Sequence, residues 1–173
     1  IDGRKIGEYA LCSASRAKEA LIVAKEAFAS AKCAPLSQRI AWINDVADRL
    51  SEQKEEFARV ITLEVGKPIK FSRIEVQRCI ETLRLTSSLA LEVGGKTIPT
   101  DAAPSGKPTL SFYKRVPCGV VVAITPFNFP LNLSAHKIAP ALIMGNSVVY
   151  KPTPEAPQTA YMFSKLFIES PFA

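Results

Sequence analysis

The sequence predicts an α/β protein in which amino-terminal helices precede the first half of a doubly wound parallel sheet, with a projecting β-arm between the two parts. Up to residue 95, apolar side chains recur at steps of three and four residues, the period of amphipathic helices. Beyond residue 117, two short β-branched runs alternate with helix-like segments, as in a parallel sheet covered by helices. Residues 96–116 contain β-prone runs around a Pro/Ser/Gly loop and are too polar for a central strand.

Four helices are predicted in the first part, with apolar stripes over residues 17–28, 40–50, 57–65 and 71–85. Ser13 and Ser15 are candidate N-caps of the first helix, because a side-chain oxygen can accept from the free amides of the first turn. Gly66 is a natural end of the third helix, and the pair Gly94–Gly95 ends the fourth. We expect all four stripes to pack in the core.

The second part is predicted to form two strands, residues 118–124 and 147–151, each buried on both faces. A helix over residues 131–144 connects them, and a further helix covers residues 158–168. Pro140 predicts a kink or an early end of the first of these helices, because proline lacks the amide hydrogen that the helix needs. Since only two strands are present, one edge of the sheet is expected to be open.

Composition excludes several classes of protein. Of the 173 residues 47% are hydrophobic and the net charge is +6, so the chain is not wholly disordered. Acidic and basic residues are interleaved at helical spacing, which argues against a nucleic-acid partner. Three prolines interrupt the most apolar run, residues 116–135, so no membrane span is predicted. The four cysteines are widely spaced and the single histidine has none near it, so we expect no metal site and reduced thiols in a cytoplasmic protein.

Polar groups follow both predicted strands, in residues 125–130 and 152–155. Ligands of open parallel sheets bind beyond the carboxyl ends of the strands, so these two loops form the candidate site. Asn128 lies between two aromatic residues in a loop flanked by two prolines, and its side-chain amide could stabilise charge that develops on a carbonyl oxygen. The alternative is an asparagine that bonds only its own turn.

Lys151 ends the second strand within a stretch, residues 102–154, that contains no acidic residue. A cation there suits a ribose hydroxyl or a phosphate, and a lysine that merely extends into solvent is equally compatible. Neither GxGxxG nor GxxxxGK[ST] occurs, so a dinucleotide would bind without the usual glycine fingerprint. Cys118 is expected to begin a buried strand rather than act as a nucleophile, because no activating group is evident.

Three motifs occur in order along the chain: EVGKP at residues 64–68, ITPFNFP at 124–130 and PALIMGNSVVYKP at 140–152. With them, residues 64–83 and 118–160 closely resemble the aldehyde dehydrogenase superfamily. The resemblance implies oxidation of an aldehyde to a carboxylic acid with NAD or NADP, through a thioester on a cysteine. It also implies an atypical Rossmann-like cofactor-binding domain, formed in part by residues 1–95 and 117–173. Residues 96–116 would be the β-arm of an oligomerisation element, and the enzyme would be a homo-oligomer.

The resemblance also assigns roles to site residues. Asn128 matches the asparagine of the oxyanion hole, and Lys151 matches the lysine that bonds the adenosine ribose. The segment that lines the cofactor site is matched by Ile124, Thr125, Pro126 and Phe127. The sequence around the loop resembles members that act on small hydroxylated or phosphorylated aldehydes.

Two departures from the family pattern matter. NAD-preferring members often carry glutamate three residues after the lysine, where this chain has Pro154, with Glu155 following. NADP therefore remains open beside NAD. The family's nucleophilic cysteine and general-base glutamate lie beyond the part that this chain matches, so we expect an amino-terminal portion of an enzyme that is inactive alone. A non-catalytic scaffold or assembly module with the same fold is the alternative.

Overall fold

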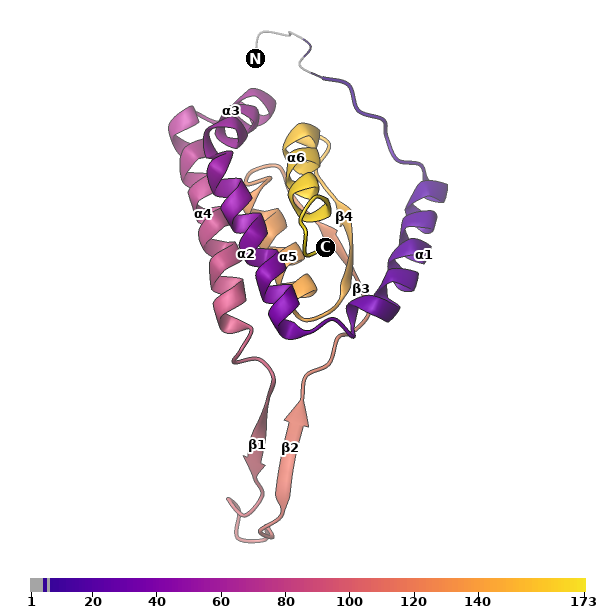
Figure 1. The fold of residues 1–173 in the computed structure, drawn as a ribbon, viewed down its shortest axis with the longest axis vertical. Helices are drawn as coiled ribbons and strands as arrows, with labels where there is room; N and C mark the ends of the chain where they lie inside the picture. The colour runs from indigo at the N-terminus through magenta and orange to yellow at the C-terminus, as the bar shows by residue number, and fades with distance from the viewer. Residues whose placement is uncertain (1–4, 6) are drawn as a thin grey trace.

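The structure, a computed structural model, describes residue 5 and residues 7–173 (Figure 1). Residues 1–4 and 6 belong to the predicted cofactor-binding part and lie outside the described residues. The elements, in chain order, are α1 (Ala14–Ala31), α2 (Leu36–Glu52), α3 (Lys54–Val65), α4 (Ile69–Leu89), β1 (Gly95–Pro99), β2 (Leu110–Lys114), β3 (Val120–Ile124), α5 (Asn132–Ile143), β4 (Ser147–Lys151) and α6 (Pro157–Ile168). This order confirms the predicted α/β fold class with its projecting arm.

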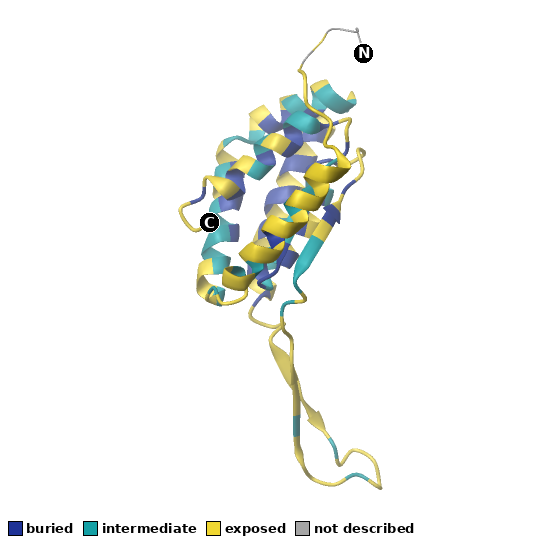
Figure 2. Cartoon of the chain, turned by 90° about the vertical axis from the view of Figure 1, so that its right-hand side faces the viewer, coloured by how far each residue is buried: buried dark blue, intermediate teal, exposed yellow. Residues whose placement is uncertain are grey.

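The helices lie on both sides of the parallel pair β3–β4 (Figure 1). Helix α5 packs against both strands on one side, and α1 packs against them on the other. Beyond α5 and α6 lies a further layer, in which α2 and α4 pack together, α4 contacts α5, and α2 and α3 contact α6. The core therefore lies mainly between this outer layer and the pair α5–α6, where Figure 2 shows most of the buried residues.

Two of the four predicted apolar stripes, those of α2 and α3, lie in this core. The stripe of α4 is buried only in part, because Phe71, Ile74 and Leu85 are exposed. Ile43 and Leu50 of α2, Phe57 of α3 and Leu83 of α4 are fully buried. The expectation for the first stripe is wrong, because α1 buries only Ala24, while Leu21 stays 42% exposed. The reason is that α1 lies outside the sheet and, in the described residues, has no further layer beyond it.

Two helix ends follow the expected local chemistry. The Ser13 side chain accepts from the Arg16 amide at 3.3 Å and so caps the beginning of α1. Gly66 ends α3 in the left-handed conformation, with φ of 68°, which glycine adopts without strain.

Pro140 does not end α5 early, since the helix continues to Ile143. Pro140 and His136 are both exposed, so water can bond the His136 carbonyl that the missing amide leaves free.

The strands β3 and β4 are parallel, in register from Val120 opposite Ser147 to Ile124 opposite Lys151. The expectation that both faces are buried is wrong for β3, because Val122 remains 49% exposed. Each strand pairs with one neighbour among the described residues, and α1 covers its face only in part. For the same reason Cys118, just before β3, is exposed rather than buried.

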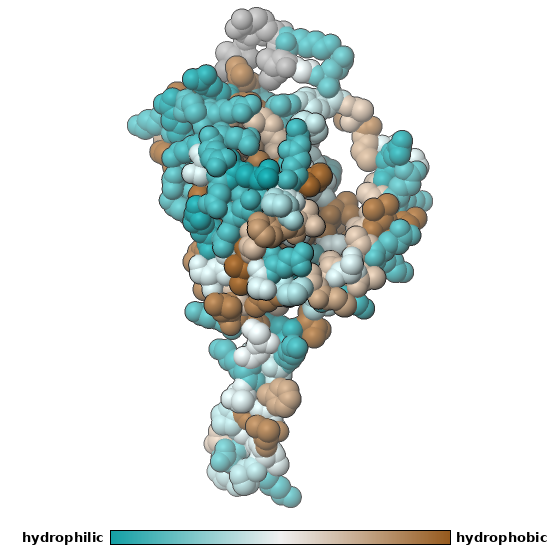
Figure 3. Space-filling view, viewed as in Figure 1, coloured by the Kyte–Doolittle hydropathy of each residue, from teal (hydrophilic) through white to brown (hydrophobic). Residues whose placement is uncertain are grey.

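The β-arm consists of β1 and β2, paired antiparallel from Gly95 opposite Lys114 to Pro99 opposite Leu110. It extends away from the body of the molecule in Figure 1, and most of its residues are exposed. Leu110 and Phe112 are 84% and 69% exposed, and brown apolar surface is visible along the arm in Figure 3. Within residues 5 and 7–173, no helix combines the length and the apolar character that crossing a membrane requires.

Candidate functional site

The carboxyl ends of β3 and β4 meet at one edge of the sheet, as the sequence predicts. Ile124 and Lys151 form the last pair of the register, and the Thr125 amide donates to the Lys151 carbonyl at 3.3 Å. The Ile124 carbonyl accepts from Lys137 of α5. The two candidate loops therefore begin side by side, one after each strand.

The first loop is attached to the interior at its beginning and at its end. Thr125 is buried, and the Ser134 hydroxyl lies 3.4 Å from its Oγ1 and donates to the Pro130 carbonyl at 2.5 Å. Ser134 also bonds the Tyr150 hydroxyl at 2.6 Å, and burial raises the pKa of Tyr150. The Thr125 side chain thus takes part in a buried hydroxyl network rather than projecting from the edge.

The middle of this loop is exposed. Pro126, Phe127 and Asn128 all face solvent beyond the end of β3. The Asn128 side-chain amide makes no hydrogen bond to any of the described residues, and so none to its own turn. It is therefore free to donate to a bound molecule.

A buried ion pair lies directly beneath this loop. Glu75 of α4 is fully buried, and its Oε1 accepts from the backbone amides of Leu131 and Asn132, at 3.0 and 3.3 Å. Its Oε2 pairs with Lys67 Nζ, which also donates to the Asn128 carbonyl at 2.7 Å. The side chain of α5's own N-cap residue forms no capping bond, so this distant carboxylate satisfies the first amides of α5.

The second loop carries Lys151, Pro154 and Glu155, all exposed. Lys151 Nζ donates only a long bond to the Pro152 carbonyl, at 3.4 Å, among the described residues. Thr153 donates to the Glu155 carboxylate, and this bond, followed by the residue's own backbone and the Lys151 charge, holds the pKa of Glu155 below its usual value. A cation and an ionised carboxylate therefore share the end of β4.

Another glutamate caps the helix that follows this loop. Glu64 of α3 accepts from the backbone amides of Gln158 and Thr159, at 2.6 and 2.9 Å, and from the Thr159 hydroxyl at 2.6 Å. The amino ends of α5 and α6 both lie at the edge where β3 and β4 end, and both are occupied by carboxylates. A phosphate group therefore finds neither of these two helix N-termini free.

Glu64, Lys67 and Glu75 were not identified as site residues from the sequence. The signal that could have found Glu75 is its position within the buried stripe of α4, between Ser72 and Cys79, where a charged residue needs a partner. The partners themselves are far away in sequence, so no local pattern reveals them. No cluster of metal-ligating side chains occurs in the described part of the chain.

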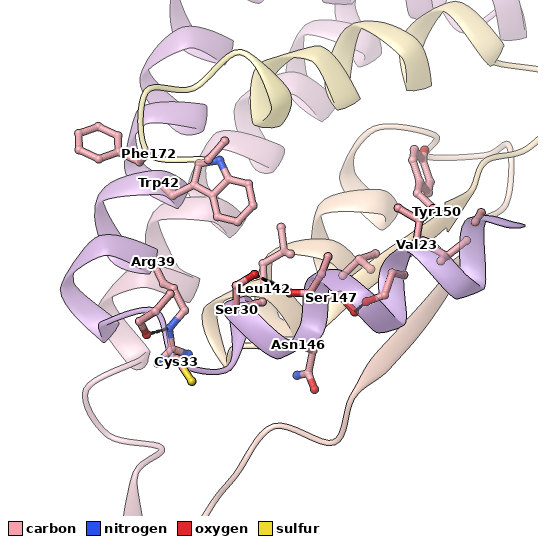
Figure 4. Close-up of a pocket in the computed structure, with 18 of the residues that line it drawn as sticks. Val23, Ser30, Cys33, Arg39, Trp42, Leu142, Asn146, Ser147, Tyr150 and Phe172 are labelled. Atoms are coloured by element: carbon pink, nitrogen blue, oxygen red, sulfur yellow. Dashed lines mark hydrogen bonds between the residues drawn. The ribbon is translucent and has the colours of Figure 1, made fainter.

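A cavity of about 1150 Å³ lies elsewhere, between α1, the beginning of α2 and β4 (Figure 4). Trp42 and Arg39 line it from α2, Val23 from α1 and Ser147 from β4. The cavity follows β4 from Ser147 to Tyr150, on the side of the strand that faces α1. Its lining is mostly apolar and holds none of the predicted site residues.

The fold and the edge where β3 and β4 end define an α/β protein that presents polar groups at the carboxyl ends of parallel strands. The sequence model of the aldehyde dehydrogenase family matches residues 1–172. The chain belongs to the aldehyde dehydrogenase family.

Curated relatives agree with this assignment. The lactaldehyde dehydrogenase of Methanococcus aeolicus is 43% identical over 161 residues, which are 93% of this chain and 33% of the relative. The 3-sulfolactaldehyde dehydrogenase of Priestia aryabhattai is 42% identical over 133 residues, 77% of this chain and 28% of the relative.

Solved structures give the same result. The glyceraldehyde-3-phosphate dehydrogenase GapN of Methanocaldococcus jannaschii, complexed with NADP, matches with a TM-score of 0.88 and 38% identity, over 96% of this chain and 35% of that one. PnpE in complex with nicotinamide adenine dinucleotide matches with a TM-score of 0.87 and 34% identity, over 97% of this chain and 34% of that one. The chain thus spans about a third of the length of the relatives that it matches.

Proposed function

We propose that this chain supplies the amino-terminal part of the cofactor-binding domain of an NAD(P)-dependent aldehyde dehydrogenase. Residues 1–95 and 117–173 would form this part, and the whole enzyme would oxidise an aldehyde to a carboxylic acid through a cysteine thioester. The cysteine and the general base would come from outside the region matched here. The 173-residue chain by itself is expected to show no dehydrogenase turnover.

The observation that carries the proposal is the exposed amide of Asn128 at the carboxyl edge. Acyl-transfer chemistry generates negative charge on the carbonyl oxygen, and a fixed neutral donor stabilises that charge without reorganising. Asn128 has the required donor, its backbone is anchored, and no described residue occupies its amide. Its role in the reaction would be to hold the substrate oxygen as it becomes negative.

The residues at the second strand end fit the ribose portion of a dinucleotide. Lys151 has free donors for ribose hydroxyls, and the ionised Glu155 is an acceptor beside it. The exposed residues Ile124, Pro126 and Phe127 would line the approach to the site, and Thr125 would contribute its backbone. When bound, the cofactor would accept a hydride from the substrate. Because carboxylates occupy the amino ends of α5 and α6, we propose that the cofactor's phosphates are not bound at these two helix ends.

The site has one charge that would favour NADP and one that would favour NAD. Lys151 would attract the additional phosphate of NADP, whereas Glu155 would repel it. Pro154, at the position where NAD-preferring members carry glutamate, offers no side-chain acceptor of its own. We therefore propose that both NAD and NADP are accepted.

A small 2-hydroxyaldehyde is the proposed class of substrate. The relatives named above are called lactaldehyde, 3-sulfolactaldehyde and glyceraldehyde-3-phosphate dehydrogenases, and these three aldehydes share a hydroxyl on the carbon next to the aldehyde. The test is reduced-cofactor formation by the complete polypeptide that carries this chain, with each aldehyde and each cofactor. Asn128→Ala should lower kcat by about 100- to 1000-fold, while Asn44→Ala in α2 serves as the matched control.

Equal kcat for Asn128→Ala and the parent would remove Asn128 from the mechanism. Turnover by the purified 173-residue chain would contradict the division of the site proposed above. Absence of turnover from the complete polypeptide with every aldehyde would favour the non-catalytic assembly module instead.

We also propose that the β-arm, residues 96–116, joins copies of a homo-oligomeric, cytoplasmic enzyme. Its support is the exposure of Leu110 and Phe112, since large apolar side chains on a projecting edge gain by pairing with another chain. Leu110→Asp together with Phe112→Asp should reduce the mass measured by light scattering to that of a smaller assembly. An unchanged mass would refute the role of the arm.

A further inference from the structure

The loop that carries Asn128 is attached unevenly. Downstream, the carbonyls of Phe129 and Pro130 are bonded to α5. Upstream, the Thr125 amide is bonded to β4. Between these anchors, the hydrogen bond from Lys67 to the Asn128 carbonyl is the one that residues 126–128 form with the described part of the chain. The placement of Asn128 therefore depends on Lys67 more than on any neighbour in its own loop.

Lys67 is itself held in place from several directions. Its ammonium pairs with the buried Glu75 and lies 4.1 Å from the centroid of the Phe129 ring. Its side chain is only 14% exposed. Glu75 is bound on its other oxygen by the first amides of α5, so the pair connects α4, α5 and the loop in one rigid unit.

We propose that Lys67 and Glu75 are a positioning pair, which fixes the backbone at Asn128 and so directs its side-chain amide toward the substrate oxygen. This inference rests on the proposed function, in which Asn128 donates to that oxygen. Neither residue of the pair touches the substrate; both act through Asn128. A donor that is misplaced by about 1 Å loses much of its catalytic effect, so the pair controls kcat rather than the binding of the aldehyde.

The contribution to folding can be separated from the contribution to positioning. Lys67→Met alone would leave the Glu75 charge buried without a partner, which destabilises the fold. Adding Glu75→Gln removes that charge, and the glutamine oxygen still accepts from the amides of α5. Methionine fills the space of the lysine stem but cannot donate to the Asn128 carbonyl. The double variant therefore keeps the helix cap and loses the positioning bond together with the other contacts of the Lys67 ammonium, to Glu75 and the Phe129 ring.

In the complete polypeptide, Lys67→Met/Glu75→Gln should lower kcat by about 10- to 100-fold, with the KM of the aldehyde unchanged within about two-fold. Urea unfolding checks that the variant is folded, and Lys67→Leu/Glu75→Gln, which also lacks the donor, carries the same prediction if the methionine variant is not. The matched control is Arg73→Met/Glu55→Gln. It removes the ion pair between Arg73 of α4 and Glu55 of α3, whose charged atoms are 2.7 Å apart, and should leave kcat unchanged.

The decisive measurement repeats the double variant in an Asn128→Ala background. If the pair acts through Asn128, it should lower kcat by less than about two-fold there, because the group that it positions is already missing. If the double variant lowers kcat by the same factor in the Asn128→Ala background as in the original one, the pair acts elsewhere and the inference is overturned. So would an unchanged kcat in the original background when Asn128→Ala alone is strongly impaired. An unimpaired Asn128→Ala enzyme would instead refute the proposed function.

Discussion

Replacing Asn146 by alanine should destabilise the chain by about 3 kcal/mol. Asn146 is buried, and its Oδ1 accepts from the backbone amides of Cys118 and Gly119 at 2.7 and 3.0 Å, while its Nδ2 donates to the Ala141 carbonyl at 3.0 Å. Each such hydrogen bond contributes about 1 kcal/mol net, and alanine replaces none of them. For a chain of this size the melting temperature should fall by about 6–12 °C.

The loss of stability should appear in the unfolding of the whole chain, because Asn146 connects the beginnings of both strands. It does so immediately before their register starts at Val120 and Ser147. Urea unfolding can be followed by the fluorescence of Trp42, the single tryptophan, whose indole donates to the Phe167 carbonyl at 3.0 Å across α2 and α6. Asn44→Ala removes a comparable amide from α2 and should change the free energy of unfolding by no more than about 0.5 kcal/mol. If Asn146→Ala is as mild as Asn44→Ala, the bonds to the strand beginnings do not stabilise the sheet.

Three further results are expected. Glu64→Ala removes the cap of α6 and should reduce the free energy of unfolding by about 2 kcal/mol in urea titrations, with Glu64→Gln intermediate; equal stability of all three would contradict the cap. Burial raises the pKa of the Cys79 thiol, so the folded chain keeps a proton that the unfolded chain loses above about pH 8.5. Stability should therefore fall as pH rises beyond that value, by at most about 1.4 kcal/mol per pH unit, and a Cys79→Ala variant with the same slope would exclude this thiol as the cause. In the complete polypeptide, Glu155→Gln should raise the ratio of kcat/KM for NADP to that for NAD by about two- to five-fold, since it removes a charge that repels the extra phosphate; an unchanged ratio would show that Glu155 does not face it.

The local part of the fold could be predicted from the sequence. The positions of the helices, both parallel strands and the arm follow from periodicity and from end signals such as Ser13 and Gly66. The meeting of Ile124 and Lys151 at one edge follows from the parallel pairing of their strands. Each of these inferences needs only local sequence patterns and the rule that consecutive strands joined by a helix lie parallel in one sheet.

What could not be predicted depends on distant partners. The burial of β3 was overestimated, because burial depends on how many layers and strands cover Val122 rather than on its own type. Pro140 was expected to disturb α5, and its tolerance depends on the exposure of the side of the helix on which it lies. The cap of α5 by Glu75 joins residues more than fifty positions apart, so no spacing rule could reveal it.

The two carboxylates at the amino ends of α5 and α6 also limit how this scaffold can be redesigned. Grafting a glycine-rich turn before either helix, the usual way to build a nucleotide-binding loop, would place phosphates against Glu75 or Glu64. Such a graft would need both a neutral cap and a new partner for Lys67. The edge is better suited to engineering at its exposed side chains, Asn128, Lys151 and Glu155, which can be exchanged without disturbing a helix cap.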